Sequence, residues 1–310
     1  MGRVAGFWIR LVSDLLDAAI LGVIGFVVAR IFRGALLSLG ERAVIFGAPI
    51  TLAYTGLLQS SIGRGQTLGK RLFRLRVLRL DGQYLSLDRS LTRWAVMGIM
   101  SYGGAVAIAL GSVLPFVKVQ TMTAALGGTQ LALVLGCVLL VPFHPLKRGL
   151  HDLLTGSIVI RGGRIPTDLI ARLHNPRRDR ILVFAAIAVA VIGTMASTLL
   201  SRHLPVALQP AARVMTSVAD LGVQNPGVVE QFNHGPNGDS HSIVVSGYVP
   251  TNDDGTPRIP RADDQILTLV RDNMPLAGVD AIVISLRSGI NLGIYSSYET
   301  TNRVERVGAK

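Results

Sequence analysis

Three ionisable residues lie in the first apolar stretch of the chain, at Arg10, Asp14 and Asp17. At 100° per residue on a helix, their side chains project within an arc of about 60°. An ionised group near the bilayer centre costs at least ~2.5 kcal/mol, so we expect this stripe to face other helices or a water-filled cavity rather than lipid. Arg10 and Asp14, four residues apart, can pair directly, whereas Asp17 needs a separate partner.

Two interpretations of this stripe stay open. In the functional one, Asp17, together with Asp14, binds or relays a cation. In the structural one, Arg10 pairs with the acids and fixes the helix to an element on the cytoplasmic side.

A second polar motif, Thr67-Leu-Gly69-Lys70-Arg71, follows the second apolar stretch. It is not a P-loop, because the position after the lysine, which must be Ser or Thr there, is Arg71. The residues after it predict a β-hairpin that turns at Asp81-Gly82.

A third motif spans residues 144–154, with Leu146, Leu150, Leu153 and Leu154 on one helical face and Lys147, Arg148, His151 and Asp152 on the other. This pattern predicts a short amphipathic helix at the membrane interface. The next segment, Ser157–Arg161, reads as a strand that could join the hairpin. His151 and Asp152 make an improbable catalytic dyad, because neighbours on a helix diverge by 100° and no nucleophile accompanies them. We expect them instead to be partners for Arg10 or Arg71.

The elements that must position these residues are long apolar segments. Of the 310 residues, 49% are hydrophobic and 16% are charged, against roughly 25% charged in soluble domains, which argues against an ordinary soluble enzyme. Five segments approach the ~20 residues that cross a bilayer as a helix. They are Val4–Ile31, Ala43–Ile62, Ala95–Val117, Met122–Phe143 and Ile181–Leu200.

The distribution of basic residues predicts an orientation. Residues 63–93 and 144–180 each hold eight Lys or Arg, which places both loops in the cytoplasm, next to anionic lipid headgroups. The N-terminus is then cytoplasmic and residues 201–310 are extracytoplasmic. Residues 1–200 carry 22 basic and 8 acidic side chains, whereas residues 201–310 carry 9 and 11. Because the basic residues bracket apolar segments, we expect a membrane and not a nucleic acid as the partner.

The last 110 residues predict a separate α+β domain with the order α-β-β-α-β-β. Its predicted elements are Pro210–Leu221, Val228–Phe232, Ser242–Val249, Ala262–Asn273, Val279–Leu286 and Ile290–Ser297. We expect neither a metal nor a cofactor, because His203, His234 and His241 lack metal-ligand spacing. Cys137, the one cysteine, allows no intrachain disulfide.

The three motifs together resemble the RDD family of bacterial membrane proteins over about residues 3–162. The resemblance rests on Arg10 and Asp17, on Thr67-x-Gly69-Lys70-Arg71 before Asp81-Gly82, and on Arg148-Gly-Leu-His151-Asp152-Leu-Leu. It implies that the arginine and the two aspartates after which the family is named are Arg10, Asp17 and Asp152 in this chain. Asp14 lies outside that pattern, and the C-terminal domain resembles no family that we recognise. Members of the family are mostly uncharacterised, and transport, including cation/proton exchange, is proposed for some.

The predicted fold is an α-helical multi-pass membrane bundle of about five spans with a small cytoplasmic β element, followed by the extracytoplasmic α+β domain. Its parts are an RDD-like membrane domain of four spans (1–162), a basic cytoplasmic linker with the fifth span (163–200) and the outer domain (201–310). We expect a bacterial plasma membrane protein and not an enzyme. One hypothesis is transport of a cation or small solute by the Arg and Asp residues. The other is a non-transporting anchor or scaffold that presents its outer domain to an envelope protein.

Overall fold

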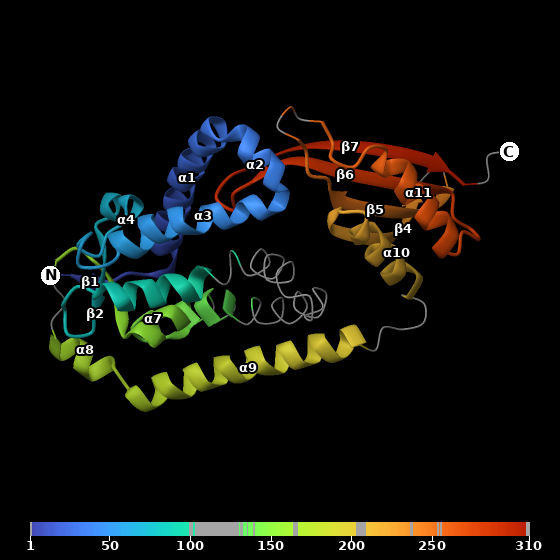
Figure 1. Cartoon of the computed structure of the whole chain (residues 1–310). Helices are drawn as coiled ribbons and strands as arrows, with labels where there is room; N and C mark the ends of the chain where they lie inside the picture. Colours follow the sequence, from blue (N-terminus) through green and yellow to red (C-terminus); the bar gives the residue numbers. More distant parts are fainter. Residues whose placement is uncertain are drawn as a thin grey trace. The chain divides into compact units, whose positions relative to one another are not determined.

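The computed structural model of the chain is shown in Figure 1. It describes residues 2–98, 102, 130, 133–134, 136–138, 140–163, 167–202, 209–235, 238–252, 254 and 256–307. The chain forms two compact units. The first consists of Met1–Gly25 and Val44–Arg202, and the second of Phe26–Ala43 and His203–Lys310. The second unit therefore combines an early segment with the whole C-terminal region.

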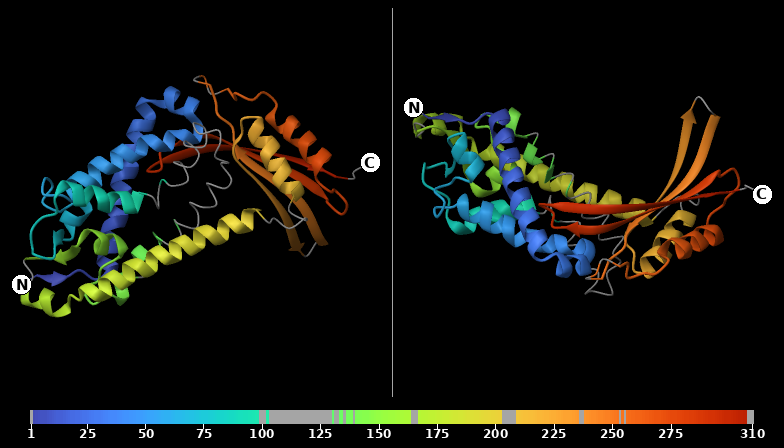
Figure 2. Two further views of the ribbon diagram at one scale, coloured as in Figure 1. Left: turned by 60° about the horizontal axis from the view of Figure 1, so that its bottom comes forward. Right: turned by 90° about the horizontal axis from the view of Figure 1, so that it is seen from above.

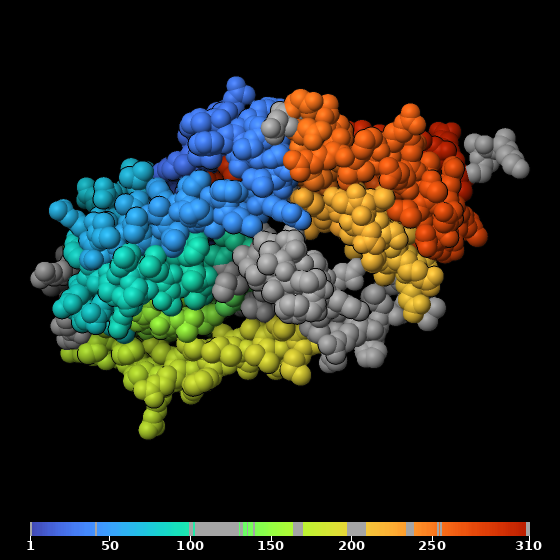
Figure 3. Space-filling view, viewed as in Figure 1, coloured from blue at the N-terminus to red at the C-terminus, as the bar shows by residue number. Residues whose placement is uncertain are grey.

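Two helices among the described residues are long and apolar enough to cross a membrane, α1 (Phe7–Ile31) and α9 (Pro176–Arg202). The 25 residues of α1 extend about 37 Å at 1.5 Å per residue, which exceeds the ~30 Å hydrocarbon core. Only 6% of the most apolar window of α9 is buried within the protein, and Figure 3 shows much of its flank open on the face in view. A third candidate is the bent pair formed by α2 (Arg33–Leu39) and residues Val44–Leu57.

The first and last of the five predicted spans correspond to α1 and α9. The second, Ala43–Ile62, is helical over α3 (Val44–Thr51) and η2 (Leu52–Leu57), and it qualifies as a span only together with α2. The predicted spans Ala95–Val117 and Met122–Phe143 lie mostly outside the described residues. The apolar helices point to a membrane protein, and the number of crossings stays a prediction.

A three-stranded sheet in the first unit brings distant segments together. Its strands are β1 (Arg3–Val4), β2 (Leu75–Arg79) and β3 (Ser157–Arg161), and β3 lies in the middle, antiparallel to both neighbours. Strand β2 directly follows α4 (Leu68–Leu72) in the chain, and apolar side chains pack on both faces of the sheet. The expected joining of Ser157–Arg161 to the hairpin region is confirmed, because β3 pairs with β2 along all five of its residues.

The predicted hairpin is only partly formed. The chain does turn at Asp81-Gly82, where the Arg79 amide donates to the Gln83 carbonyl at 2.8 Å. The returning strand, however, is reduced to a single bridge between Leu78 and Tyr84. The next residue, Leu85, is fully buried against the sheet and bridges to the segment after η2 instead.

The prediction of an amphipathic helix over residues 144–154 is wrong in two respects: the helix is shorter, and its polar face is not exposed. The helix here is α7 (Leu150–Thr155), and both His151 and Asp152 are buried, whereas Leu154 is 44% exposed. The predicted polar face is directed inward because Asp152 forms ion pairs with the distant Arg10 and Arg93, and His151 is buried beside it. A short helix, α8 (Thr167–Leu173), follows the sheet and precedes α9.

The C-terminal domain has the expected order of elements. These are α10 (Gln209–Asp220), β4 (Gln224–Gly235), β5 (Gly238–Tyr248), α11 (Ala262–Asn273), β6 (Ala281–Asn291) and β7 (Ser296–Arg306). The strands form one sheet in the order β4-β5-β6-β7, in which only β5 and β6 are parallel, joined through α11. Figure 2 shows α10 and α11 on one face of this sheet, where they bury the domain core.

The last predicted strand, Ile290–Ser297, is misplaced. These residues form the end of β6, the turn and the start of β7, and the strand proper runs over Ser296–Arg306. The sequence of β7 is almost entirely polar, because the side facing α11 carries charged groups: Arg303 pairs with Asp263 at 2.9 Å, and Glu305 with Arg271 at 3.0 Å. A strand without apolar alternation gives little signal in a sequence.

The early segment of the second unit packs against the β6–β7 hairpin. Leu36 and Leu37 of α2 form a buried cluster with Ile290 and Leu292. The following turn, η1 (Gly40–Ala43), approaches so closely that a side chain at Gly40 would lie 2.7 Å from the ring of Tyr248. Gly40 also has a φ of +62°, so both its conformation and the available space require glycine.

Candidate functional site

Asp17 lies at the centre of the first charged site, where its carboxylate accepts three hydrogen bonds and lies near one ammonium group. Oδ1 accepts from the Tyr54 hydroxyl and from the Gly69 amide, both at 2.7 Å. Oδ2 accepts from the Thr67 hydroxyl at 2.5 Å and lies 3.5 Å from the Lys70 ammonium. A carboxylate offers about four lone-pair positions, so these hydrogen bonds use most of them. The residue is 5% exposed.

The Thr67-x-Gly69-Lys70 motif forms this site because it begins a helix. Thr67 is the N-cap of α4, and its hydroxyl also accepts from the Lys70 amide. The Gly69 amide, in the first turn of the helix, is thereby directed at Asp17, which is favourable for an anion. A Cβ at Gly69 would lie 2.5 Å from the Ser13 carbonyl oxygen and 2.8 Å from Asp17, so no side chain fits. Arg71, the last residue of the motif, is on the surface.

The widened helical turns of η2 bring Tyr54 to Asp17. Pro49 in the preceding α3 lacks an amide donor and disturbs the regular hydrogen bonding of the helix. The next turns are of the π type, which is uncommon and often found where a side chain has a special position.

Asp14 has a different environment from Asp17. Its carboxylate pairs with Lys70 at 2.6 Å, and its side chain is 50% exposed, whereas that of Lys70 is 6% exposed. Among the described residues, Arg10 pairs with Asp152 and not with Asp14, so the local i, i+4 pair is not formed. The predicted arc of three charges is therefore divided between two different sites.

Asp152 is the centre of the second charged site and is fully buried. Arg10 lies 3.1 Å from its Oδ2 and Arg93 lies 2.8 Å from its Oδ1. The Ser157 hydroxyl and the Gly149 amide complete its shell at 3.0 and 3.3 Å. The expectation that Asp152 is a partner for Arg10 is confirmed.

The remaining donors of Arg10 fasten α1 to the sheet. Its Nε donates to the Ala5 carbonyl at 3.2 Å and its Nη2 to the Val159 carbonyl at 3.3 Å. One guanidinium thus joins α1, β3 and α7, which is a geometry that the planar fork of arginine suits.

The electrostatics of the second site keep Asp152 ionised and His151 neutral. Burial raises the pKa of the Asp152 carboxyl, but Arg93, His151 and Arg10 outweigh it and hold that pKa below its usual range. The pKa of His151 is lowered to about 4, chiefly by burial. His151 therefore carries no charge at neutral pH and is a packing neighbour of Asp152, 3.6 Å away.

A third charged group, around Asp179 at the start of α9, adjoins the second site. Asp179 contacts Arg148, and it accepts from His144 at 3.1 Å. Arg148 is buried and donates to the Ser157 carbonyl at 2.9 Å and to the Asp152 carbonyl at 3.0 Å. Among the described residues, the ion pairs of the three sites include the cations Arg10, Lys70, Arg93, Arg148 and Arg178 and the carboxylates Asp14, Asp17, Asp152 and Asp179.

Sequence reasoning missed Tyr54 and Arg93. Tyr54 lies in an apolar segment, where an aromatic residue is ordinarily part of the core. Arg93 was counted only among the basic residues that set orientation, and its one signal is its position directly before an apolar stretch. Among the residues that the structure describes, no group of three or more His, Cys, Asp or Glu could hold a metal ion.

The sequence model of the RDD family matches residues 4–156, the region that contains both Asp17 and Asp152. This part of the chain belongs to the RDD family. A relative is the uncharacterized protein YckC of Bacillus subtilis (strain 168), which is 28% identical over 155 residues, or 50% of this chain and 83% of the relative. No solved structure gives a significant match. Together with the apolar helices, the family identifies a membrane protein, and the geometry above shows where its Arg and Asp residues lie.

Proposed function

We propose that this RDD protein is a non-transporting membrane scaffold, which anchors its C-terminal domain and presents it to an envelope protein. The observation that carries the proposal is that buried Asp17 accepts hydrogen bonds from Tyr54, Gly69 and Thr67 and has Lys70 as its counter-charge, 3.5 Å away. A cation carrier must exchange its ligands, and most lone-pair positions of this carboxylate are already occupied from within the protein.

The second charged site supports the same role. Asp152 has no exposed surface, and its two arginines come from α1 and from the helix that follows β2. Removing one partner from a buried pair leaves an uncompensated charge, which makes such a group a strong constraint on structure. The charges therefore act as fasteners between chain segments that are far apart in sequence.

The proposal includes the topology given by the basic loops. The chain crosses a bacterial plasma membrane about five times, with the N-terminus and both basic loops in the cytoplasm and the C-terminal domain outside. No catalytic step is part of it.

The sheet of the C-terminal domain offers a surface for a partner. Val229, Val244, Val283 and Val304 are in register across the four strands, on the face opposite α10 and α11. Val229 and Val304, at the two ends of this row, are 61% and 62% exposed. Adjacent rows are mainly serine and other small residues.

Transport of a cation or small solute is the second candidate, and one observation favours it. Asp14 is half-exposed within α1, so one acid of the stripe is accessible.

Flux and cross-linking separate the two functions. Proteoliposomes with the wild-type chain are assayed for cation and proton flux, with Asp14→Asn and Asp17→Asn as variants and Asp81→Asn in the exposed turn as the control. The scaffold proposal expects the wild type to give no flux above empty liposomes. A flux that Asp14→Asn abolishes and Asp81→Asn preserves would establish transport instead.

Cross-linking tests the positive part of the proposal. A photoreactive amino acid replaces Val229 or, as the control, Thr268 on the exposed side of α11. We expect the Val229 probe, in cells that express the full chain, to capture the same envelope protein repeatedly and the Thr268 probe not to capture it. Failure of the Val229 probe to give a reproducible adduct would count against the scaffold.

A further inference from the structure

Two cavities in the first unit share Leu154 in their lining. One, of about 340 Å³, lies between α7 and α9 and is almost entirely apolar. The other, of about 390 Å³, lies where the end of α7 approaches Arg89 and Thr92. Leu154 lines both, and it is 44% exposed although it is a large apolar side chain.

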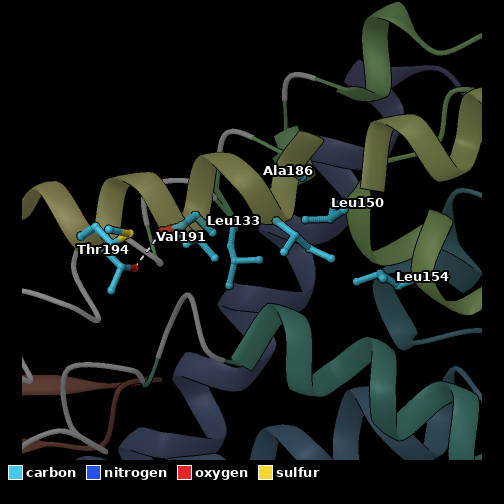
Figure 4. Close-up of a pocket in the computed structure, with 9 residues that line it drawn as sticks. Leu133, Leu150, Leu154, Ala186, Val191 and Thr194 are labelled. Carbon is cyan, nitrogen blue, oxygen red and sulfur yellow. Dashed lines mark hydrogen bonds between the residues drawn. The ribbon is translucent and has the colours of Figure 1, made fainter. Parts of the chain in front are cut away.

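The apolar cavity follows the axis of α9. Figure 4 shows its lining as a row, with Thr194 and Val191 at one end, Leu133 and Ala186 between, and Leu150 and Leu154 at the other end. The stretch of α9 from Ala186 to Thr194 rises about 12 Å. Because α9 is a candidate membrane span with little of its surface buried, this row lies at a depth where hydrocarbon is the solvent.

The second cavity, whose lining is part polar and part apolar, contains a cation with spare hydrogen-bonding capacity. Arg89 is partly buried, and its Nη1 donates to the Thr155 carbonyl at a long 3.4 Å. Within the described part of the chain, Arg89 has no carboxylate at ion-pair distance, in contrast to Arg10, Arg93 and Arg148. Most of its five donors are therefore left for another acceptor.

We propose that the joined cavities bind one anionic phospholipid, with an acyl chain in the apolar cavity and the phosphate at Arg89. The order of the two chemistries matches such a molecule: the cation lies at the α7 end and the hydrocarbon slot continues from there along α9. Arginine binds phosphate through paired, charge-assisted hydrogen bonds, and most donors of the Arg89 guanidinium are available for them. The site is independent of the proposed scaffold function.

Photo-labelling of the wild-type chain tests the proposal without any substitution. The purified protein is reconstituted into phosphatidylcholine vesicles with a small fraction of phosphatidylglycerol that carries a diazirine, placed either at the end of an acyl chain or near the glycerol. We expect the terminal probe to label the peptide around Thr194 and Met195, and the glycerol-proximal probe to label the peptide around Leu150 and Leu154. Equal labelling by the corresponding phosphatidylcholine probes would show an ordinary boundary lipid and overturn the proposal.

Two variants locate the acyl chain and the headgroup. Ala190→Trp places an indole in the apolar cavity and should abolish the labelling by both probes, whereas Ile192→Trp, at a 64% exposed position of the same helix, should not. Arg89→Gln should reduce the preference for phosphatidylglycerol over phosphatidylcholine about tenfold, since a hydrogen bond to a charged group contributes roughly that factor. Arg177→Gln, at an exposed arginine on α9, is its control.

A folding control and the comparison of the two arginine variants decide between binding and no binding of the lipid. Thermal unfolding in detergent shows whether Ala190→Trp is folded, and if it is not, the wild-type labelling pattern decides alone. If Arg89→Gln keeps the full preference for phosphatidylglycerol, or loses no more of it than Arg177→Gln does, Arg89 does not bind the headgroup and the proposal is overturned.

Discussion

Replacing Asp152 by asparagine tests whether the buried charges hold the membrane domain together. The substitution keeps the size and shape of the side chain but removes the charge between Arg10 and Arg93. One oxygen can still accept from Arg93 and Ser157. The new amide group takes the position of Oδ2, where it meets the donors of Arg10 and Gly149.

The magnitude follows from these contacts. Two hydrogen bonds are lost and two buried guanidinium groups are left without their counter-charge. Removing one partner of a buried ion pair ordinarily costs about 3–5 kcal/mol, because the remaining charge is uncompensated. We expect a loss of that size in the free energy of unfolding. The more exposed pair of Arg79 and Asp81, 3.0 Å apart, provides the control, since Asp81→Asn should cost about 0–1 kcal/mol.

The assay is equilibrium unfolding of the full chain in mixed micelles with an increasing fraction of denaturing detergent. Both variants and the wild type are measured at pH 7 and low salt. A double-mutant cycle with Arg93→Gln measures the interaction energy between Asp152 and Arg93. The double variant should be less destabilised than the sum of the two single changes. If Asp152→Asn lowers the free energy of unfolding by less than about 1 kcal/mol, or if the two changes are strictly additive, the ion pairs of this site do not stabilise the membrane domain as proposed.

Three further changes test the two sites. Gly69→Ala should cost about 1–3 kcal/mol, because its Cβ would lie 2.8 Å from Asp17, whereas Gly98→Ala, with its nearest neighbour at 3.5 Å, should be well tolerated; equal thermal stability of the two would contradict the close approach. Tyr54→Phe should cost about 1–3 kcal/mol by removing a donor from a buried carboxylate, and an unchanged unfolding midpoint would mean that the hydroxyl is dispensable. Because the folded pKa of His151 is about 4 and its unfolded pKa about 6.5, the unfolded chain binds more protons between these values and the wild type should lose about 2 kcal/mol from pH 7 to pH 5. His151→Gln should remove most of that dependence, and a pH profile identical to that of the wild type would show that another group is responsible.

The motifs were predictable from sequence because they place charged residues in or beside apolar segments, where burying an unpaired charge costs free energy. An acid in an apolar helix must have a partner, so Arg10 and Asp17 signal buried contacts wherever they occur. The partners themselves depend on tertiary structure. Nothing in the spacing of Asp152 relates it to Arg93, which is 59 residues earlier in the chain, and Tyr54 reaches Asp17 only because η2 is widened after Pro49.

The errors in the fold arise where apolar periodicity does not report the structure. In α7, Asp152 is buried against Arg10 and Arg93, although periodicity analysis assumes that polar residues face water. β7 is an edge strand whose residues are mostly exposed, so it has no apolar alternation to detect. The order of elements in the C-terminal domain was predictable because its other strands keep the apolar alternation that a core requires.

The packing of Leu36 and Leu37 on the β6–β7 hairpin has a consequence for how the protein is made. The ribosome completes this early segment 247 residues before it reaches Ile290. At about 5–20 residues per second, roughly 10–50 s pass between the synthesis of α2 and that of the hairpin that buries its apolar side chains. In a nascent chain, these apolar side chains of α2 therefore lack their packing partners until the β6–β7 hairpin has been synthesised.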